Sequence, residues 1–410
     1  MRRRDFALSL AASTAIRAVP RASAARINRI TMAPIQGRFH KFVAMNSYDT
    51  APKGHTYEGT LLRIQTDQGV EGIGPGSSDP AAIEALKLLL GADPMAVYQL
   101  EAGRIINRSP RYSTVLARFR FLDGALFDLI GKLTGNPAWK LIGSSARDRV
   151  EVYDGTLYFS DIWFKDRGVH AVVEEAQEAK SSGYRGLKLK LGRGWKWMEK
   201  DAGLQRDIEV VHAVRQAVGT QMKVMVDPNN GYRDDRERAW KLMAETAGAH
   251  LYWMEEIFPE AVADYTWLRE KMAQAGIKTL IADGESQRDI MAFEPFLKPV
   301  RLIDVLQLDI RVGGFLDNRA LAQTAASAGA ECVPHNWASQ LGGLMGLQIS
   351  KAVGNIPGAE DDRSTCDVIV SRGYERRDGS YTVPDKPGLS IGVDEEVYAR
   401  KSKPREIVLS

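Results

Sequence analysis

Three acidic residues end short β-rich segments in the middle of the sequence: Asp227, Glu255 and Glu285. On adjacent strands, about 4.8 Å apart, their carboxylates would converge and repel one another unless a proton or a cation lay between them. An all-oxygen ligand set without Cys or His suits a hard cation such as Mg²⁺. The spacing therefore predicts a magnesium site with positions left for water and a substrate carboxylate.

Basic residues flank this acidic group. Lys188 and Lys190 are two positions apart in one β-rich segment, so their side chains face the same way. Two ammonium groups beside a cation lower each other's pKa, so that one lysine could act as a neutral base. On the other side, Asp309 ends one segment and His335 ends the next. An Asp that accepts a bond from one imidazole nitrogen raises the basicity of the other.

Each of these residues also has an ordinary structural explanation. A carboxylate at a strand end often caps the next helix, a lysine pair can be a solvated basic pair, and a lone His is more often structural. Helix capping, however, requires neither Lys nor His. The pattern favours abstraction of the proton next to a carboxylate, followed by its return, which is racemisation, or by loss of a β-hydroxyl, which is dehydration.

Eight β-rich segments carry these residues and alternate with amphipathic stretches from residue 149 onward. The segments are 150–153, 186–190, 223–227, 251–255, 279–283, 305–309, 331–335 and 358–361. Strand–helix units that close on themselves make an α/β barrel, whose active site lies at the carboxyl ends of the strands. A doubly wound open sheet is the alternative, and it is disfavoured because no Gly-rich phosphate fingerprint opens the first unit.

The sequence before the barrel predicts an α+β domain over 26–148. Residues 26–65 alternate as antiparallel strands around an exposed loop within 42–57, and residues 80–145 have mostly helical spacing. The barrel domain then covers 149–365, and residues 366–410 return to pack on the first domain. The loop residues that we expect to close over the barrel are His40, Lys41, Phe42, Asn46, Tyr48, His55 and Tyr57.

The first 24 residues look like an export signal. Arg3-Arg4-x-Phe6 precedes a weakly apolar stretch and Ala22-Ser23-Ala24, which resembles a twin-arginine signal and predicts a periplasmic protein. The alternative is a ragged basic N-terminus on a cytoplasmic protein. This segment holds five arginines and one aspartate, so the formal charge of +3 on the whole chain comes from the segment. The rest of the chain has no excess of positive charge that would imply a nucleic-acid partner.

Composition excludes several other classes of protein. Hydrophobic residues make up 44% and charged residues 26%, which are ordinary globular values and exclude a disordered chain. No apolar run is long enough to span a membrane. Two cysteines, Cys332 and Cys366, exclude a disulfide framework and a multi-cysteine zinc site.

Together the motifs resemble the enolase superfamily, and within it the mandelate racemase/muconate lactonizing enzyme family. The matching motifs are Lys188-Leu-Lys190, Val226-Asp227-Pro-Asn229, Glu255-Glu256, Gly284-Glu285, Gln307-Leu-Asp309 with Gly313-Gly314, and Pro334-His335. The resemblance implies an α+β capping domain on a modified (β/α)₇β TIM-like barrel, and a homo-oligomer. The paired glycines lie one residue closer to Asp309 than is usual, and Glu255-Glu256 lacks the proline that usually follows directly.

The resemblance also implies roles for individual residues. Asp227, Glu255 and Glu285 would bind Mg²⁺, Lys190 and the Asp309–His335 dyad would be the two bases, Lys188 would help to hold the substrate carboxylate, and Glu360 would hydrogen-bond the enolate. The run Glu360-Asp361-Asp362 offers three acids for that last role. Retention of the His–Asp pair favours the mandelate racemase-like subgroup over the cycloisomerases, which carry a lysine in this region; Arg311 is the nearest cation, and arginine is a poor base.

The activity that these features predict is magnesium-dependent dehydration of an acid sugar. Abstraction of the α-proton would give a metal-stabilised enolate, and loss of the β-hydroxyl would follow. One alternative is a racemase or epimerase of a 2-hydroxy acid that uses the same two bases. Another is a non-catalytic exported protein that binds acid sugars; the presence of every expected metal and base residue argues against it.

Overall fold

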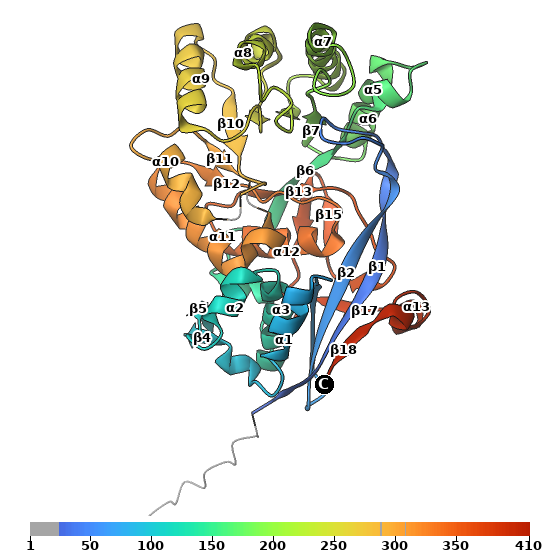
Figure 1. Cartoon of the computed structure of the whole chain (residues 1–410), viewed down its shortest axis with the longest axis vertical. Coiled ribbons are helices and arrows are strands. Elements are labelled where there is room, and N and C mark those ends of the chain that lie inside the picture. Colours follow the sequence, from blue (N-terminus) through green and yellow to red (C-terminus); the bar gives the residue numbers. More distant parts are fainter. Residues whose placement is uncertain (1–23, 288, 308) are drawn as a thin grey trace, which may run out of the picture.

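Eight parallel strands surrounded by helices form the larger part of the molecule, and a smaller α+β part lies against one side of it (Figure 1). The computed structural model describes residues 24–287, 289–307 and 309–410. The predicted signal segment lies outside the described residues apart from Ala24. Among the described residues, the helices are all too short or too polar to cross a membrane.

The eight strands follow one another around the barrel in chain order. They are β6 (Arg149–Leu157), β7 (Gly186–Lys190), β8 (Lys223–Asp227), β9 (Trp253–Glu255), β10 (Leu280–Asp283), β11 (Val305–Leu306), β12 (Glu331–Cys332) and β13 (Gly358–Asp361). Each pairs in parallel with the next from β6 to β12, and β13 pairs with β6. The amide of Glu360 donates to the carbonyl of Pro334 and joins the last two strands.

Seven helical connections join the eight strands, and the first connection contains two helices, α5 (Ser160–Trp163) and α6 (Val169–Ser181). The other helices are α7 (Lys200–Val218), α8 (Arg236–Glu245), α9 (Val262–Ala275), α10 (Glu294–Leu297), α11 (Ile310–Ser327) and α12 (Gln340–Ala352). In the described chain, β13 leads into a loop and the strand β14 (Ile369–Ser371) rather than into an eighth helix. The predicted (β/α)₇β barrel is therefore confirmed.

Strand β7 shows why the barrel interior is polar at one end. All five of its residues are buried. Leu187 and Leu189 join the core between the sheet and the outer helices, whereas Lys188 and Lys190 alternate with them and face inward. The same alternation that fills the core with leucine thus delivers two ammonium groups to the inside of the barrel.

The capping part is a four-stranded antiparallel sheet with helices packed on it. Its strands are β1 (Ile27–Val43), β2 (Gly54–Thr66), β3 (Glu71–Pro75) and the C-terminal β18 (Ile407–Leu409), in the order β18-β1-β2-β3. Helix α3 (Leu122–Thr134) packs against β3 so closely that a Cβ atom at Gly72 would lie 2.1 Å from the carbonyl oxygen of Ala125. The smaller elements are α1 (Pro80–Lys87), β4 (Tyr98–Glu101), β5 (Arg104–Arg108), α2 (Ser113–Arg118) and α4 (Ala138–Ile142).

The first half of the loop between β1 and β2 is buried, whereas the sequence predicts an exposed loop; the second half is partly exposed. Figure 1 shows both strands extending from the capping helices up to the barrel near β7. Asn46 donates to Asn229 Oδ1 at 3.0 Å, and Ser47 Oγ donates to the carbonyl of Pro228 at 2.9 Å. Residues 44–47 are therefore buried against the loop that follows β8.

The last part of the chain touches both other parts. Strand β18 pairs with β1 of the capping sheet, whereas β16 (Ser380–Thr382) pairs with β6 of the barrel. Between them, Glu395 at the start of α13 (Glu395–Lys401) pairs with Arg63 of β2. The other strands of this segment are β15 (Glu375–Arg377) and β17 (Ile391–Val393). The C-terminal segment thus links the capping sheet to the barrel.

Candidate active site

The two inward lysines of β7 lie among carboxylates at the carboxyl end of the barrel. Lys188 Nζ lies 2.8 Å from Glu255, 3.1 Å from Glu360 and 3.4 Å from Asp227, and no part of its side chain is exposed. Lys190 Nζ donates to Asp227 Oδ2. Strand alternation therefore places both lysines on the same acidic group, as the sequence predicts.

The three predicted metal ligands meet. One carboxylate oxygen from each of Asp227, Glu255 and Glu285 lies within 4.8 Å of the other two. Asp227 and Glu255 are fully buried at the ends of β8 and β9, and Glu285 follows β10 with 13% of its side chain exposed. Oε2 of Glu285 is buried and accepts no hydrogen bond in the described structure. This arrangement fits an oxygen-ligated divalent cation.

The predicted His–Asp pair lies on the other side of this group. Nδ1 of His335 is 3.2 Å from Asp309 Oδ2, and Nε2 is 3.3 Å from Glu285 Oε2. Because an ionised carboxylate can only accept, Nδ1 carries the proton in the bond to Asp309. Nε2 therefore faces the carboxylate group at Glu285, whereas Lys190 contacts the same group at Asp227.

Both members of this pair lie beyond the strands that the sequence assigned to them. Strand β11 ends at Leu306 and β12 at Cys332, three residues earlier than expected in each case. Asp309 is the N-cap of α11, where its Oδ1 accepts from the amide of Arg311 at 2.7 Å. A carboxylate at this position can cap a helix or take part in catalysis. Asp309 both caps α11 and bonds to His335.

Glu360 points into the barrel, whereas the next two acids do not. Its Oε1 faces Lys188, and its Oε2 accepts from the amide of Asn336 at 3.1 Å. Asp361 instead accepts from the hydroxyl of Tyr184, and Asp362 accepts from the amide of Ser339. The geometry therefore assigns the last strand-end position to Glu360.

Sequence reasoning gave no role to Glu256, which lies beside the carboxylate group. Alternation along a strand would turn it away from Glu255, but its backbone has φ of +42° and the chain turns after β9. Its carboxylate accepts from Tyr48, Asn229 and Ser286 at 3.0 to 3.1 Å. The Glu255-Glu256 doublet was the only sequence signal for this residue.

Only part of the capping loop reaches this region. Asn46 bonds to Asn229, and Tyr48 bonds to Glu256. Phe42 instead stacks on Trp163 with ring centroids 5.2 Å apart, and His55 packs edge-on against Phe42. The remaining residues of the predicted set pair elsewhere: His40 lies near Glu178, Lys41 pairs with Glu175, and Tyr57 packs on Phe39.

The pKa values of these groups show that carboxylates dominate the site. Burial alone would lower the pKa of both lysines, but the surrounding acidic groups, led by Glu255 at Lys188 and by Asp227 at Lys190, together outweigh burial and raise it well above the usual value. Burial, opposed by Lys188 and assisted by Asp227, raises the pKa of Glu255 to about 7. Burial followed by repulsion from Glu285 raises the pKa of Glu256 to about 8.

Comparison with known families gives a match over the barrel. The model of the family described as enolase C-terminal domain-like matches residues 171–397. Among curated proteins, D-galactarolactone cycloisomerase of Agrobacterium fabrum is 27% identical over 365 residues, covering 84% of this chain and 91% of its own. D-xylonate dehydratase of Haloferax volcanii is also 27% identical, covering 82% of this chain and 84% of its own.

Solved structures match the whole architecture. Galacturonate dehydratase from Geobacillus sp., complexed with D-galacturonate and 5-keto-4-deoxy-D-galacturonate, superimposes with a TM-score of 0.83 at 27% identity and covers 95% of this chain and 100% of its own. A mandelate racemase/muconate lactonizing protein from Geobacillus sp. Y412MC10, complexed with magnesium and tartrate, gives a TM-score of 0.80 at 28% identity, covering 92% and 95%.

Proposed function

The chain belongs to the enolase C-terminal domain-like family, and from that premise we propose that it is a lyase that removes water from an acid sugar. One observation carries the proposal: in a group of three carboxylates that end β8 and β9 and follow β10, Lys190 contacts the first, Asp227, and His335 contacts the last, Glu285. Two bases around one cation site are the arrangement that proton abstraction next to a carboxylate requires.

Lys190 and His335 act in different steps of the proposed reaction. Asp227 holds Lys190 protonated in the metal-free protein, and a cation bound at Asp227 would offset that carboxylate and allow Lys190 to be neutral. Neutral Lys190 then accepts the proton from the carbon next to the substrate carboxylate, and the electron pair of that bond forms the enolate. The C–O bond at the next carbon then breaks, and protonated His335 gives its Nε2 proton to the departing hydroxyl, which leaves as water. The resulting enol tautomerises, gaining a proton at C3 and losing the proton of the C2 hydroxyl, which yields a 2-keto-3-deoxy acid.

Mg²⁺ fits the three carboxylates Asp227, Glu255 and Glu285, because the donor set is all oxygen and one buried oxygen of Glu285 accepts no hydrogen bond. When bound there, the ion would supply positive charge beside the substrate carboxylate. Lys188 supplies a second positive charge from β7, and the carboxylate of Glu360 faces its ammonium group. These positions support the roles that we propose for both residues in holding the substrate carboxylate and hydrogen-bonding the enolate.

The relatives support an acid sugar as the substrate class. Two of the proteins described above are dehydratases of D-galacturonate and D-xylonate by name, and the related structure with magnesium also holds tartrate, a hydroxy acid. We therefore propose hexuronic and aldonic acids as the first substrates to test. Racemisation or epimerisation of a 2-hydroxy acid remains a second candidate, since a base on each side of the site could return the proton to either face.

A screen in D₂O tests the proposal and separates these candidates. The Mg²⁺-loaded protein is incubated with aldonic, uronic and aldaric acids, and ¹H NMR follows the α-proton while semicarbazide detects 2-keto products. We expect a 2-keto product from at least one acid and no product after EDTA treatment. Deuterium incorporation without loss of water would indicate the racemase instead.

Two variants complete the screen as matched controls. Lys190→Ala and His335→Asn each remove one base, so both should abolish product formation. Failure of the wild-type protein to convert or exchange any acid in the library would contradict the proposal and favour a non-catalytic binding protein.

We also propose the domain bounds, the assembly and the location of the protein. The division into a capping domain (26–148), a catalytic barrel (149–365) and a C-terminal segment (366–410) remains our proposal, as does a homo-oligomer. Segment 1–24 would direct export to the periplasm through the twin-arginine route. Cell fractionation of the wild type and of an Arg3→Lys, Arg4→Lys variant tests this, since the variant should stay in the cytoplasm.

A further inference from the structure

Arg311 makes more contacts with Asp309 than helix capping requires. Its Nη2 lies 2.6 Å from Oδ2 of Asp309 and its Nε lies 3.1 Å from Oδ1, in addition to the bond from its backbone amide. Oδ2 is also the oxygen that faces Nδ1 of His335 at 3.2 Å. One carboxylate thus connects the guanidinium to the imidazole.

The backbone and the side chain of Arg311 make different contacts with Asp309. Asp309 would cap the helix whatever the side chain at position 311, because its Oδ1 accepts from the backbone amide of that residue. The guanidinium adds two donors in a planar fork that matches a carboxylate. That fork fixes the plane of the Asp309 carboxylate and therefore which oxygen is presented to His335.

We propose that Arg311 is a positioning residue for the His335–Asp309 dyad. Its guanidinium holds Asp309 ionised and in the orientation that accepts the Nδ1 proton, which leaves Nε2 of His335 directed at the carboxylate group. Burial would raise the pKa of Asp309, but the charge of Arg311, together with the hydrogen bonds from His335 and Arg311, outweighs burial and keeps that pKa below its usual value. The Arg311 side chain bonds to Asp309 and, among the described residues, makes no hydrogen bond or ion pair with the three carboxylates or the two lysines.

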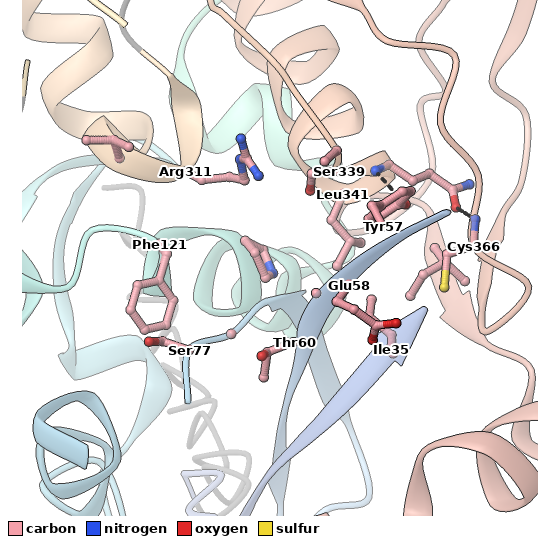
Figure 2. Close-up of a pocket in the computed structure, with 17 residues that line it drawn as sticks. Ile35, Tyr57, Glu58, Thr60, Ser77, Phe121, Arg311, Ser339, Leu341 and Cys366 are labelled. Carbon is pink, nitrogen blue, oxygen red and sulfur yellow. Dashed lines mark hydrogen bonds between the residues drawn. The ribbon is translucent and has the colours of Figure 1, made fainter. Parts of the chain in front are cut away.

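A pocket gives access to Arg311 from outside the barrel. Figure 2 shows Arg311 and Ser339 from the barrel across from Thr60 and Ser77 of the capping part. The pocket has a volume of about 350 Å³, and 29% of the Arg311 side chain is exposed. A small cation can therefore enter the space that truncation of Arg311 would leave. Chemical rescue is possible for this arginine because of that opening.

The experiment observes the hydrogen bond between His335 and Asp309 directly. Full-length Mg²⁺-loaded protein is labelled with ¹⁵N-histidine, and ¹H–¹⁵N spectra detect the Nδ1 proton of His335, assigned by its absence in His335→Asn. In Arg311→Ala we expect this proton to exchange with water about tenfold faster or more, because the bond loses its fixed acceptor. Millimolar ethylguanidinium should restore the wild-type signal.

Two further variants separate positioning from a general loss of structure. Arg311→Lys keeps a charge without the fork and should give an intermediate exchange rate. Arg319→Ala is the matched control, because Arg319 lies on the same helix but donates to the carbonyls of Ile105 and Ile142. An Nδ1 signal in Arg311→Ala or Arg311→Lys with the wild-type exchange rate would overturn the proposal, as would absence of that signal from the wild type.

A second readout concerns catalysis and rests on the proposed function. With an acid that the wild type converts, Arg311→Ala should behave like His335→Asn: product formation falls, while α-proton exchange that depends on Lys190 persists. Equal loss of both would contradict positioning of the dyad. If the wild type converts no acid, the proposed function fails, and the exchange rate of the Nδ1 proton still decides the role of Arg311.

Discussion

Two groups of side chains in the described structure have the geometry to hold a metal ion, and they differ in what already neutralises them. One is the barrel group of Asp227, Glu255 and Glu285, and the other is His40, Asp154 and Glu178 at the outer edge of the barrel. Both bring three ligand atoms within 4.8 Å of one another. Distance alone therefore does not distinguish a metal site from an ordinary polar cluster.

In the outer group, the guanidinium of an arginine already neutralises the carboxylates. Arg363 lies 3.0 Å from Asp154 and 2.6 Å from Glu178, and arginine does not lose its proton in proteins. Glu178 is also 45% exposed, so water supplies the remaining solvation. The outer group has little need of a metal.

The barrel group has more negative than positive charge. Its carboxylates are those of Asp227, Glu255, Glu256, Glu285 and Glu360, and the cations among them are Lys188, Lys190 and protonated His335. Burial removes the water that would otherwise screen this excess. Charge balance and burial, rather than the number of ligands, therefore mark the barrel group as the cation site.

The largest expected effect is on folding stability and comes from Lys188→Met. Lys188→Met removes the fully buried ammonium that three buried carboxylates share, which should cost about 3–5 kcal/mol in the metal-free protein. The matched change in the outer group, Arg363→Met, should cost about 1 kcal/mol, because Glu178 can be hydrated and the buried Asp154 still accepts two hydrogen bonds from Thr156. Urea unfolding of both variants measures the difference; equal costs would contradict the comparison.

A smaller effect is expected on stabilisation by the ion itself. At Mg²⁺ concentrations about 100 times the dissociation constant, a bound ion stabilises the folded protein by about 2.7 kcal/mol. Glu285→Gln should lose this gain, because it removes a ligand and its charge, whereas Glu178→Gln should keep it. Thermal unfolding with and without Mg²⁺ checks both. Retained stabilisation in Glu285→Gln would place the ion elsewhere.

The smallest expected effect is the pH dependence of stability at His40. Burial, and then the charge of Arg363, lower the pKa of His40 from 6.5 to about 4. The unfolded chain therefore takes up this proton before the folded protein does, so stability is lost as pH falls from about 6.5 to 4. At this partly exposed position the loss should be about 1 kcal/mol.

Comparison of the wild type with His40→Gln isolates this contribution. The stability difference between the two proteins should change across pH 4 to 6.5 and stay constant between pH 7.5 and 8.5, where His40 is neutral in both states. A difference that stays constant over the whole range would show that the outer group does not hold His40 neutral.

The lysine side of the site follows from the sequence, because strand alternation alone positions it. The observed bounds of β7 and β8 coincide with the predicted segments, and Lys188, Lys190 and Asp227 meet as expected. A period of two residues and a row of leucines on the opposite face leave one way for these side chains to point.

The histidine side was less predictable, because loops and helix starts position it. Strands β11 and β12 are short, so Asp309 and His335 depend on a helix cap and on Arg311 rather than on strand register. Arg311 was noticed in the sequence only as a poor base. Glu256 depends on a backbone turn with positive φ, and the burial of Asn46 depends on a contact with Asn229, far away in sequence. Local patterns do not specify such long-range contacts.

The most direct test of the account is a crystal structure of the protein soaked with Mn²⁺, with anomalous scattering used to locate the ion. We predict one strong peak ligated by Asp227, Glu255 and Glu285, with Lys190 and His335 on opposite sides of it. The outer group around Arg363 should show none. A peak at His40, Asp154 and Glu178, or the absence of any peak in the barrel, would contradict the claim that this carboxylate group is a cation site built for proton abstraction.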